Sequence, residues 1–239
     1  MRTILVLGTG TDVGKTYVAE QICNLLKGHT ADPVQALKPI ETGVSSGDRT
    51  DSDRLAFASR PPFLPTHAYA FEQPISPHLA ARTAGAVIET GEVVKWVHRI
   101  SGKSTATEQE NIATWLIVET AGGVFSPISE SKTNLDLAVA LEPSCWILVA
   151  TDGLGVLHNI RSTLLAMCSL ARAPDILLLN APLVKDNSTG TNREELKRLG
   201  WARAIASVRR DGGFSDEDGR ALLAKLLRHF QPVPINSIL

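Results

Sequence analysis

A glycine-rich stretch near the N-terminus has the residue types needed to bind nucleotide phosphates. It reads Gly-Thr-Gly-Thr-Asp-Val-Gly-Lys-Thr over residues 8–16 and lies between an apolar run and an amphipathic segment. A strand, a glycine-rich turn and a helix form the context of a phosphate-binding loop. Lys15 would reach the outer phosphates, and the Thr16 hydroxyl would reach Mg²⁺. The strict pattern has glycine where this chain has Thr9, so a plain strand-to-helix turn stays open as an alternative.

Carboxylates later in the chain could hold the Mg²⁺ ion. Phosphate-bound Mg²⁺ typically takes one or two protein carboxylates. Asp51 and Asp53 both qualify, although either could simply cap a helix. Glu119 ends an apolar run and precedes small residues, where a carboxylate is costly to bury unless it is paired or metal-bound. Glu119 is therefore the strongest metal-ligand candidate, and a structural salt bridge is its alternative interpretation.

Three further turns carry polar residues that suit a binding site. Lys38 follows the second apolar run and could add positive charge beside the phosphates, or could be an ordinary surface lysine. Gly153 and Gly155 precede a helical segment, whose N-terminus could bind a substrate carboxylate or could be a flexible turn. Asn180 ends another apolar run and offers the donor and acceptor that match the edge of adenine.

Segments with strand and helix patterns alternate along the chain. This alternation predicts an α/β fold with a doubly wound, mostly parallel sheet, and residues 1–239 as a single domain. Strands are expected over residues 3–8, 34–38, 113–119, 145–150, 175–180 and 204–208. Helices are expected over residues 15–27 with Gly28 as C-cap, 51–59, 78–84, 90–100 with Thr90 as N-cap, 134–141, 156–172, 194–199 and 216–230, and loops over residues 39–50 and 101–110. Five prolines exclude long regular structure over residues 60–77. Ligands of such sheets bind beyond the carboxyl ends of the strands, where the candidate residues stand.

The bulk composition is that of a globular protein, with 239 residues, 44% hydrophobic and 21% charged. The net charge of −1 gives no reason to expect a nucleic acid or an anionic membrane as partner. The cysteines lie far apart in apolar segments, which predicts burial and no disulfide or zinc framework. Met1 leads straight into the first strand, and no apolar run approaches the roughly 20 residues of a membrane span. We therefore expect a cytoplasmic protein.

Together the motifs resemble those of the dethiobiotin synthetases, a family of the P-loop NTPase superfamily. The match is an ordered set that covers most of the chain, up to about Pro182. Besides the loop it comprises Lys-Pro-Ile-Glu-Thr-Gly over residues 38–43, Ser52-Asp53, Ser76-Pro77-His78, Val-Glu-Thr-Ala-Gly-Gly over residues 118–123, Leu154-Gly155 with His158-Asn159, and Asn180. That family also displaces the first glycine of the loop by one residue, so Gly8 supports the resemblance.

The resemblance implies an ATP- and Mg²⁺-dependent ligase of biotin biosynthesis. Such an enzyme carboxylates 7,8-diaminopelargonate with CO₂ or bicarbonate. It then closes the cyclic urea of dethiobiotin through a carbamate and a carbamic–phosphoric anhydride. The resemblance also implies a homodimer.

The resemblance further implies roles for individual residues. The catalytic residues would be Lys15, Lys38 and Thr11. The Mg²⁺ ligands would be Thr16, Asp53 and Glu119. The nucleotide would be bound by Asp12, Val13, Gly14, Lys15, Thr16, Tyr17, Asp53, Glu119, Thr120, Ala121, Gly122, Asn180 and Ala181. The substrate would be bound by Lys38 and Thr42, and its carboxylate by the helix start of the partner subunit, through Gly155, Val156, Leu157 and His158.

Some positions depart from the family's usual pattern, and two other functions stay open. The family usually has glycine where Thr120 stands, often has a different pair at His158-Asn159, and tends to have proline near Arg209. These departures keep open a nucleotide-binding paralogue without catalysis. A partition-type P-loop switch ATPase is the other alternative, but that class carries an additional lysine early in the loop, and residues 8–11 have none.

Overall fold

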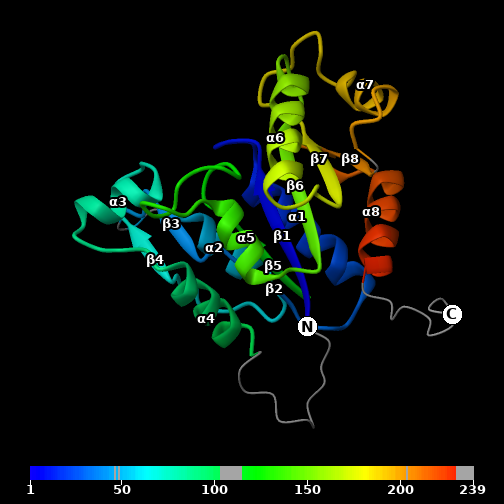
Figure 1. The fold of residues 1–239 in the computed structure, drawn as a ribbon. Coiled ribbons are helices and arrows are strands. Elements are labelled where there is room, and N and C mark those ends of the chain that lie inside the picture. The colour runs from blue at the N-terminus through cyan, green and yellow to red at the C-terminus, as the bar shows by residue number, and fades with distance from the viewer. Residues whose placement is uncertain (46, 48, 103–114, 203, 230–239) are drawn as a thin grey trace, which may run out of the picture.

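A seven-stranded sheet organises the computed structural model, which describes residues 1–45, 47, 49–102, 115–202 and 204–229. The strand order is β2-β5-β1-β6-β7-β8-β9 (Figure 1). Every neighbouring pair is parallel except β8 and β9. The strands are β1 Arg2–Gly8, β2 Val34–Leu37, β5 Trp115–Glu119, β6 Cys145–Thr151, β7 Ile176–Asn180, β8 Ile205–Arg209 and β9 Gly213–Phe214. The predicted α/β fold with a mostly parallel sheet is confirmed.

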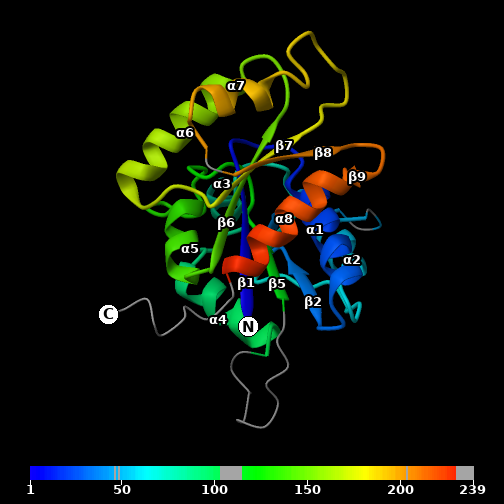
Figure 2. The same cartoon turned by 90° about the vertical axis from the view of Figure 1, so that its right-hand side faces the viewer.

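Helices cover both faces of this sheet (Figure 2). One face carries α1 Lys15–His29, α2 Asp51–Ala58 and α8 Asp216–His229, and the other carries α3 Pro77–Thr83, α4 Thr90–Ile100, α5 Asn134–Leu141, α6 Val156–Leu170 and α7 Asn192–Arg198. Successive side chains of a strand point to opposite faces. In β1, Ile4 and Val6 therefore pack in one apolar core while Leu5 and Leu7 pack in the other. Buried apolar runs in the sequence thus become central strands.

A second, two-stranded sheet stands at the side of the main sheet (Figure 1). It pairs β3, Ile40–Thr42, in parallel with β4, Tyr69–Phe71. Strand β3 falls in a segment predicted as a loop, so the sequence prediction is wrong there, whereas β4 is a three-residue strand in the proline-rich segment, for which only long regular structure was excluded. Three residues are too few to show strand periodicity, and the pairing depends on contact between segments far apart in the chain.

Two predicted helix caps are wrong. Helix α1 continues through Gly28 to His29, and Thr30 is its C-cap in extended conformation. Gly28 does not take the positive φ that makes glycine useful as a C-cap. Helix α4 begins at Thr90 itself and is preceded by Glu89, so Thr90 does not cap it.

The remaining predicted elements match the described ones to within a few residues. Ala113, Thr114 and Phe230, together with most of the predicted loop over residues 101–110, lie outside the described residues. Cys23 and Cys145 are buried as expected, but Cys168 is exposed on α6. No helix in the described part of the chain has the length and apolar character to cross a membrane.

Candidate active site

The phosphate loop connects β1 to α1 in a tight backbone turn. Asp12 and Gly14 have positive φ values of 56° and 87°. A Cβ atom at position 14 would lie 2.0 Å from Nδ2 of Asn180, so the turn needs glycine there. The ammonium of Lys15 donates to the carbonyl oxygen of Gly10 at 3.1 Å. Burial lowers the pKa of Lys15, and the charge of Glu119 opposes this effect.

A cavity of about 680 Å³ opens above this loop, within the usual size range of small-molecule sites. It brings together twelve of the residues assigned through the resemblance, which come from distant parts of the chain. They are Thr11, Asp12, Gly14, Lys15, Thr16, Tyr17, Lys38, Thr42, Glu119, Ala121, Gly122 and Asn180. Asp51, Arg54, Pro74, Leu183 and Arg210 complete the lining. The carboxyl ends of β1, β2, β5 and β7 therefore meet at one site, as expected for a parallel sheet.

Lys38 is held between two carboxylates at the floor of this cavity. Its ammonium lies 2.5 Å from Oδ2 of Asp51 and 3.1 Å from Oε1 of Glu119. Burial alone would lower the pKa of Lys38, but the two carboxylates outweigh that effect and raise it. Lys38 is therefore a fixed positive charge, available to an anion that enters the cavity.

Glu119 is the most deeply buried carboxylate of the site, with 1% of its surface exposed. Its Oε1 atom accepts a hydrogen bond from the Thr16 hydroxyl at 2.9 Å, while Oε2 has no hydrogen-bond partner among the residues that the structure describes. Burial raises the pKa of Glu119, and the nearby ammonium of Lys38 opposes the rise. An unsatisfied buried carboxylate oxygen beside a hydroxyl fits the donor set that Mg²⁺ prefers.

The protein side chains alone do not form a complete metal cage. Across the described residues, no three His, Cys, Asp or Glu side chains are grouped so that they could hold a metal ion. This matches Mg²⁺ in nucleotide sites, which takes one or two carboxylates and obtains its other ligands from phosphates and water.

The two aspartates in the first turn of α2 have different partners. Asp53 forms a capping box with Thr50, in which Oδ2 of Asp53 accepts from the backbone N–H and the hydroxyl of Thr50, each at 2.7 Å. Asp53 does not line the cavity, whereas Asp51 does. The structure thus brings Asp51 to Lys38, and the assignment of Asp53 to Mg²⁺ stays a prediction.

Other residues assigned through the resemblance also lie off the cavity lining. They are Val13, Thr120, Gly155, Val156, Leu157, His158 and Ala181. The Thr120 hydroxyl donates to the carbonyl oxygen of Val6 at 3.3 Å, so this side chain points into the sheet. Val156 is buried in the core, while His158 is exposed at the start of α6. The roles predicted for these residues stay predictions.

Asn180 brings a buried acceptor to the lining beside the phosphate loop. It donates from Nδ2 to the carbonyl oxygen of Val13 at 3.1 Å, and its buried Oδ1 has no partner within the described part of the chain. The hydroxyl of Tyr17 lies 2.6 Å from the carbonyl oxygen of Arg209 and 2.9 Å from that of Arg210, which ties α1 to the β8–β9 turn. An amide oxygen in this position could accept a hydrogen bond from a nucleobase amino group.

Sequence reasoning missed two basic residues of the lining, Arg54 and Arg210. Arg54 stands on α2, where Glu20 of α1 holds its guanidinium at 2.6 and 3.0 Å. Its spacing of three from Asp51 is a helical signal that could have been used. Arg210 lies in the turn between β8 and a two-residue strand, for which the sequence carries no clear signal.

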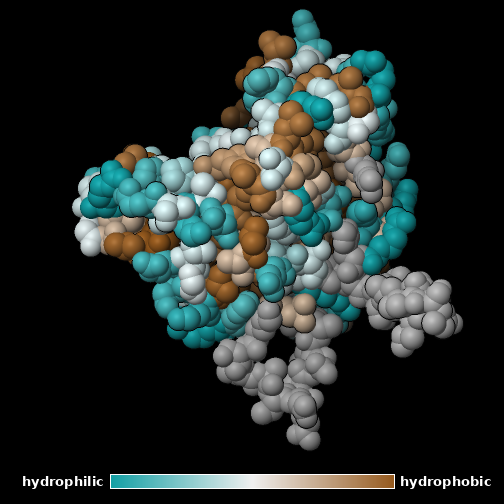
Figure 3. All heavy atoms as spheres, in the orientation of Figure 1, coloured by the Kyte–Doolittle hydropathy of each residue, from teal (hydrophilic) through white to brown (hydrophobic). Residues whose placement is uncertain are grey.

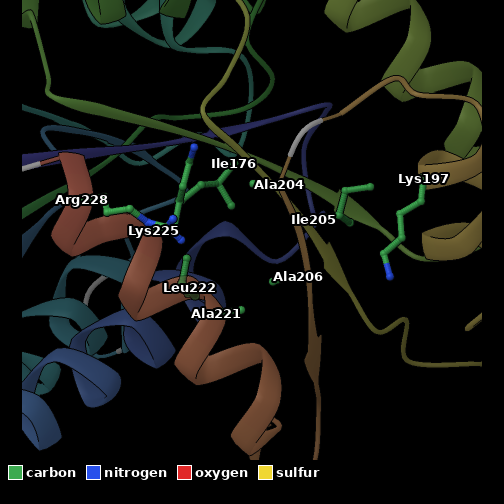
Figure 4. A pocket seen from close by; sticks show the side chains of 9 residues that line it. All are labelled: Ile176, Lys197, Ala204, Ile205, Ala206, Ala221, Leu222, Lys225 and Arg228. Atoms are coloured by element: carbon green, nitrogen blue, oxygen red, sulfur yellow. The ribbon is translucent and has the colours of Figure 1, made fainter.

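A second cavity, of about 580 Å³, lies between α7, β8 and α8 (Figure 4). Three cations, Lys197, Lys225 and Arg228, stand around a floor of small and aliphatic side chains. The strand residues that line it, such as Ile176 and Ile205, are the first residues of β7 and β8. It therefore lies at the opposite end of the strands from the phosphate loop.

Comparisons with known proteins agree with this geometry. The family model described as "AAA domain" matches residues 2–215. An "ATP-dependent dethiobiotin synthetase BioD" from Anaeromyxobacter sp. (strain Fw109-5) is 33% identical over 224 residues, covering 88% of this chain and 95% of that protein. A protein of the same name from Rhodopirellula baltica is 30% identical over 244 residues, covering 90% and 88%.

A solved structure shows the same fold at low sequence identity. The putative plasmid partition protein from Borrelia burgdorferi B31, bound to AMPPNP, has a TM-score of 0.52 and 13% identity, covering 95% of this chain and 98% of that one. This likeness concerns the fold alone and does not distinguish a switch ATPase from a ligase.

Proposed function

Because this chain belongs to the family of ATP-dependent dethiobiotin synthetases, we propose that it converts 7,8-diaminopelargonate, CO₂ and ATP to dethiobiotin. The chain is thus an ATP-dependent ligase of biotin biosynthesis with a P-loop fold. The observation that carries the specific reaction is the position of Lys38. A second ammonium beside the phosphate-loop lysine, on a side chain only 11% exposed, suits a reaction that gathers several anions in one pocket.

The proposed chemistry has three steps. One amine of the substrate takes up CO₂ and loses a proton, which forms a carbamate. A carbamate oxygen attacks the γ-phosphorus of ATP and ADP leaves. The second amine then attacks the carbon of the mixed anhydride, and phosphate leaves as the cyclic urea closes. Carbamate, γ-phosphate and anhydride are all anionic, so the reaction depends mainly on positioning and charge stabilisation.

The residues of the cavity suit these steps. Lys15 and the loop N–H groups would bind the phosphates, while Lys38 and Thr11 would hold the carbamate against the γ-phosphate. Thr42 would contact the substrate, and Asn180 would accept from the adenine amino group. The backbone near Ala121, Gly122 and Ala181 would complete the nucleotide site.

We propose Thr16, Glu119 and Asp53 as the residues that hold Mg²⁺. The bound ion would neutralise phosphate charge as ADP leaves. Support comes from the unpartnered Oε2 atom of Glu119 and its hydrogen bond to Thr16. Because the Oδ2 atom of Asp53 already accepts two hydrogen bonds from Thr50, Asp53 would offer its Oδ1 atom to the ion, directly or through water.

We propose a homodimer in which the start of α6 reaches the neighbouring subunit. Apolar side chains gather over α5 and α6 (Figure 3). Val139, Leu154, Leu165 and Leu170 are each at least half exposed. Exposed apolar clusters of this kind commonly mark protein interfaces. Gly155, Val156, Leu157 and His158 would then present a helix N-terminus to the substrate carboxylate of the partner's site. Sedimentation equilibrium tests the dimer.

The proposal treats residues 1–239 as one domain in the cytoplasm. The seven-stranded sheet, which takes strands from residue 2 to residue 214, supports a single domain. The cysteines Cys23, Cys145 and Cys168 are free, which suits a reducing compartment.

The experiment that tests this function measures whether ATP turnover depends on 7,8-diaminopelargonate. The proposal expects ADP release only when diaminopelargonate and bicarbonate are both present, with dethiobiotin formed in equal amount. If ADP were released at the same rate with and without diaminopelargonate, the result would favour the switch ATPase instead.

A further inference from the structure

We propose that Glu41 is a positioning residue, which holds the first turn of α2 so that Asp51 keeps Lys38 at the reaction centre. The inference rests on the proposed function, in which Lys38 contacts the carbamate and the γ-phosphate. It concerns Glu41 and Asp51, to which the family resemblance assigns no role.

Glu41 is a buried carboxylate that accepts hydrogen bonds from the start of α2. It stands in β3 with 5% of its surface exposed. Its Oε1 atom accepts from the backbone N–H of Asp51 at 2.7 Å. Its Oε2 atom accepts from the N–H of Ser52 at 3.2 Å and from the Ser52 hydroxyl at 2.6 Å. Glu41 thereby satisfies backbone donors that a helix N-terminus leaves free.

His67 completes this arrangement from a third segment. Its Nε2 atom donates to Oε2 of Glu41 at 2.8 Å. The carboxylate therefore connects β3, the segment before β4 and the first turn of α2. A charge-assisted hydrogen bond is stronger and more directional than one between neutral groups, so this connection restricts the position of the turn.

The turn that Glu41 holds carries the carboxylate that contacts Lys38. Asp51 is the first residue of α2, and its Oδ2 atom lies 2.5 Å from the Lys38 ammonium. Its Oδ1 atom lies 3.6 Å from Nη1 of Arg54. If the turn moved, Lys38 would keep only Glu119 as a carboxylate partner. Misplacing a reacting group by about 1 Å can reduce a rate about 100-fold.

A purely structural role would give different results from a positioning role. Helix α2 has a second anchor at its other end, where the N–H of Ala36 donates to the Ser59 hydroxyl at 2.9 Å. Ser59→Ala removes this anchor without touching the turn that carries Asp51. It is therefore a matched control for loss of stability in the same helix.

The test is a double-mutant cycle on dethiobiotin formation with Glu41→Ala, Asp51→Asn and the combined variant. We expect each single change to lower kcat about 10- to 100-fold with less effect on the KM for ATP. Because Glu41 acts through Asp51, adding Glu41→Ala to Asp51→Asn should change kcat by no more than about twofold. Ser59→Ala should retain kcat. The proposal would be overturned if Glu41→Ala lowered kcat by the same factor in wild type and in Asp51→Asn. A normal kcat in Glu41→Ala would also overturn it.

A second readout does not depend on turnover. The rate at which an amine-reactive reagent labels Lys38, measured by mass spectrometry, should rise several-fold in Glu41→Ala and in Asp51→Asn, but not in Ser59→Ala. An unchanged labelling rate would refute the positioning role, whether or not the wild-type protein forms dethiobiotin. A wild-type protein that forms no dethiobiotin would refute the proposed function, which is a separate result. If Glu41→Ala does not fold, Glu41→Gln retains one acceptor oxygen and should show a smaller increase.

Discussion

The ammonium of Lys38 lies 3.1 Å from Oε1 of Glu119, at the carboxyl ends of two neighbouring parallel strands. Leu37 of β2 is in register with Val118 of β5, so the residues that follow them, Lys38 and Glu119, lie side by side. Burying such a pair costs about as much free energy as its attraction returns. The Lys38–Glu119 ion pair is therefore better explained by a role in binding or reaction beside the phosphate loop than by a contribution to the stability of the fold.

Replacing Lys38 should stop the reaction without unfolding the protein. We expect Lys38→Ala to lower the rate of dethiobiotin formation at least about 100-fold, the scale of losing one donor to a transition state. Steady-state kinetics measure the loss, and circular dichroism checks the fold. Lys95→Ala, which removes an exposed lysine of α4, is the matched control and should keep the wild-type rate. Near wild-type turnover in Lys38→Ala would exclude the assigned role.

Glu119 should matter to nucleotide binding only when Mg²⁺ is present. We expect Glu119→Gln to weaken binding of Mg²⁺-ATP at least about tenfold, because metal sites lose 10- to 100-fold in affinity even when an outer contact is removed. Binding of ATP in excess EDTA should change little. Isothermal titration calorimetry under both conditions gives the comparison. Equal weakening with and without Mg²⁺ would argue against a metal ligand.

Two glycines of the same loop–helix unit should respond oppositely to alanine. Gly14 has φ of 87° and no room for Cβ beside Asn180, so Gly14→Ala should destabilise the fold by at least about 1 kcal/mol and impair ATP binding. Gly28 lies inside α1, and beyond the backbone of that helix no atom of the described residues lies within 4 Å of its Cβ position, so Gly28→Ala should stabilise the fold by up to about 1 kcal/mol. Urea unfolding midpoints measure both changes. A stabilised Gly14→Ala variant would contradict the loop geometry.

The positions of several site residues were predictable because each is a polar residue at the end of an apolar run. Lys38, Glu119 and Asn180 each follow an apolar run, and parallel strands bring their carboxyl ends together. The choice between Asp51 and Asp53 was not predictable, because both stand in one helical turn. The capping box of Thr50 and Asp53 and the hydrogen bonds from Asp51 and Ser52 to Glu41 fix this turn, and Asp51 is the aspartate that contacts Lys38. The short strands β3 and β4 form only by long-range pairing, which local patterns do not report.

Glu41 should make stability depend on pH in the acid range. Burial would raise the pKa of Glu41, but hydrogen bonds from His67 and Ser52 and the charge of Lys38 outweigh it and lower the pKa to about 2. A carboxyl whose pKa is lower in the folded state stabilises the fold fully above its ordinary pKa. That contribution, about 3 kcal/mol, is lost as pH falls from about 4.5 toward 2.

Glu41→Gln isolates this contribution, because glutamine does not titrate. The difference in unfolding free energy between wild type and Glu41→Gln should shrink as pH falls through this window. Charges near Glu41 on other segments, namely Lys38, His67, Asp51 and Asp53, are present in both proteins and cancel to first order. Chemical denaturation at a series of pH values measures the difference. A difference that stays constant from pH 5 to pH 2 would contradict the lowered pKa.

In the proposed reaction this site joins CO₂ to a diamine at the expense of ATP. The most direct measurement supplies the purified chain with ATP, Mg²⁺, ¹³C-bicarbonate and 7,8-diaminopelargonate and analyses the product by mass spectrometry. We expect dethiobiotin with the label in its urea carbon and one ADP released per molecule formed. ADP release without labelled dethiobiotin would contradict it.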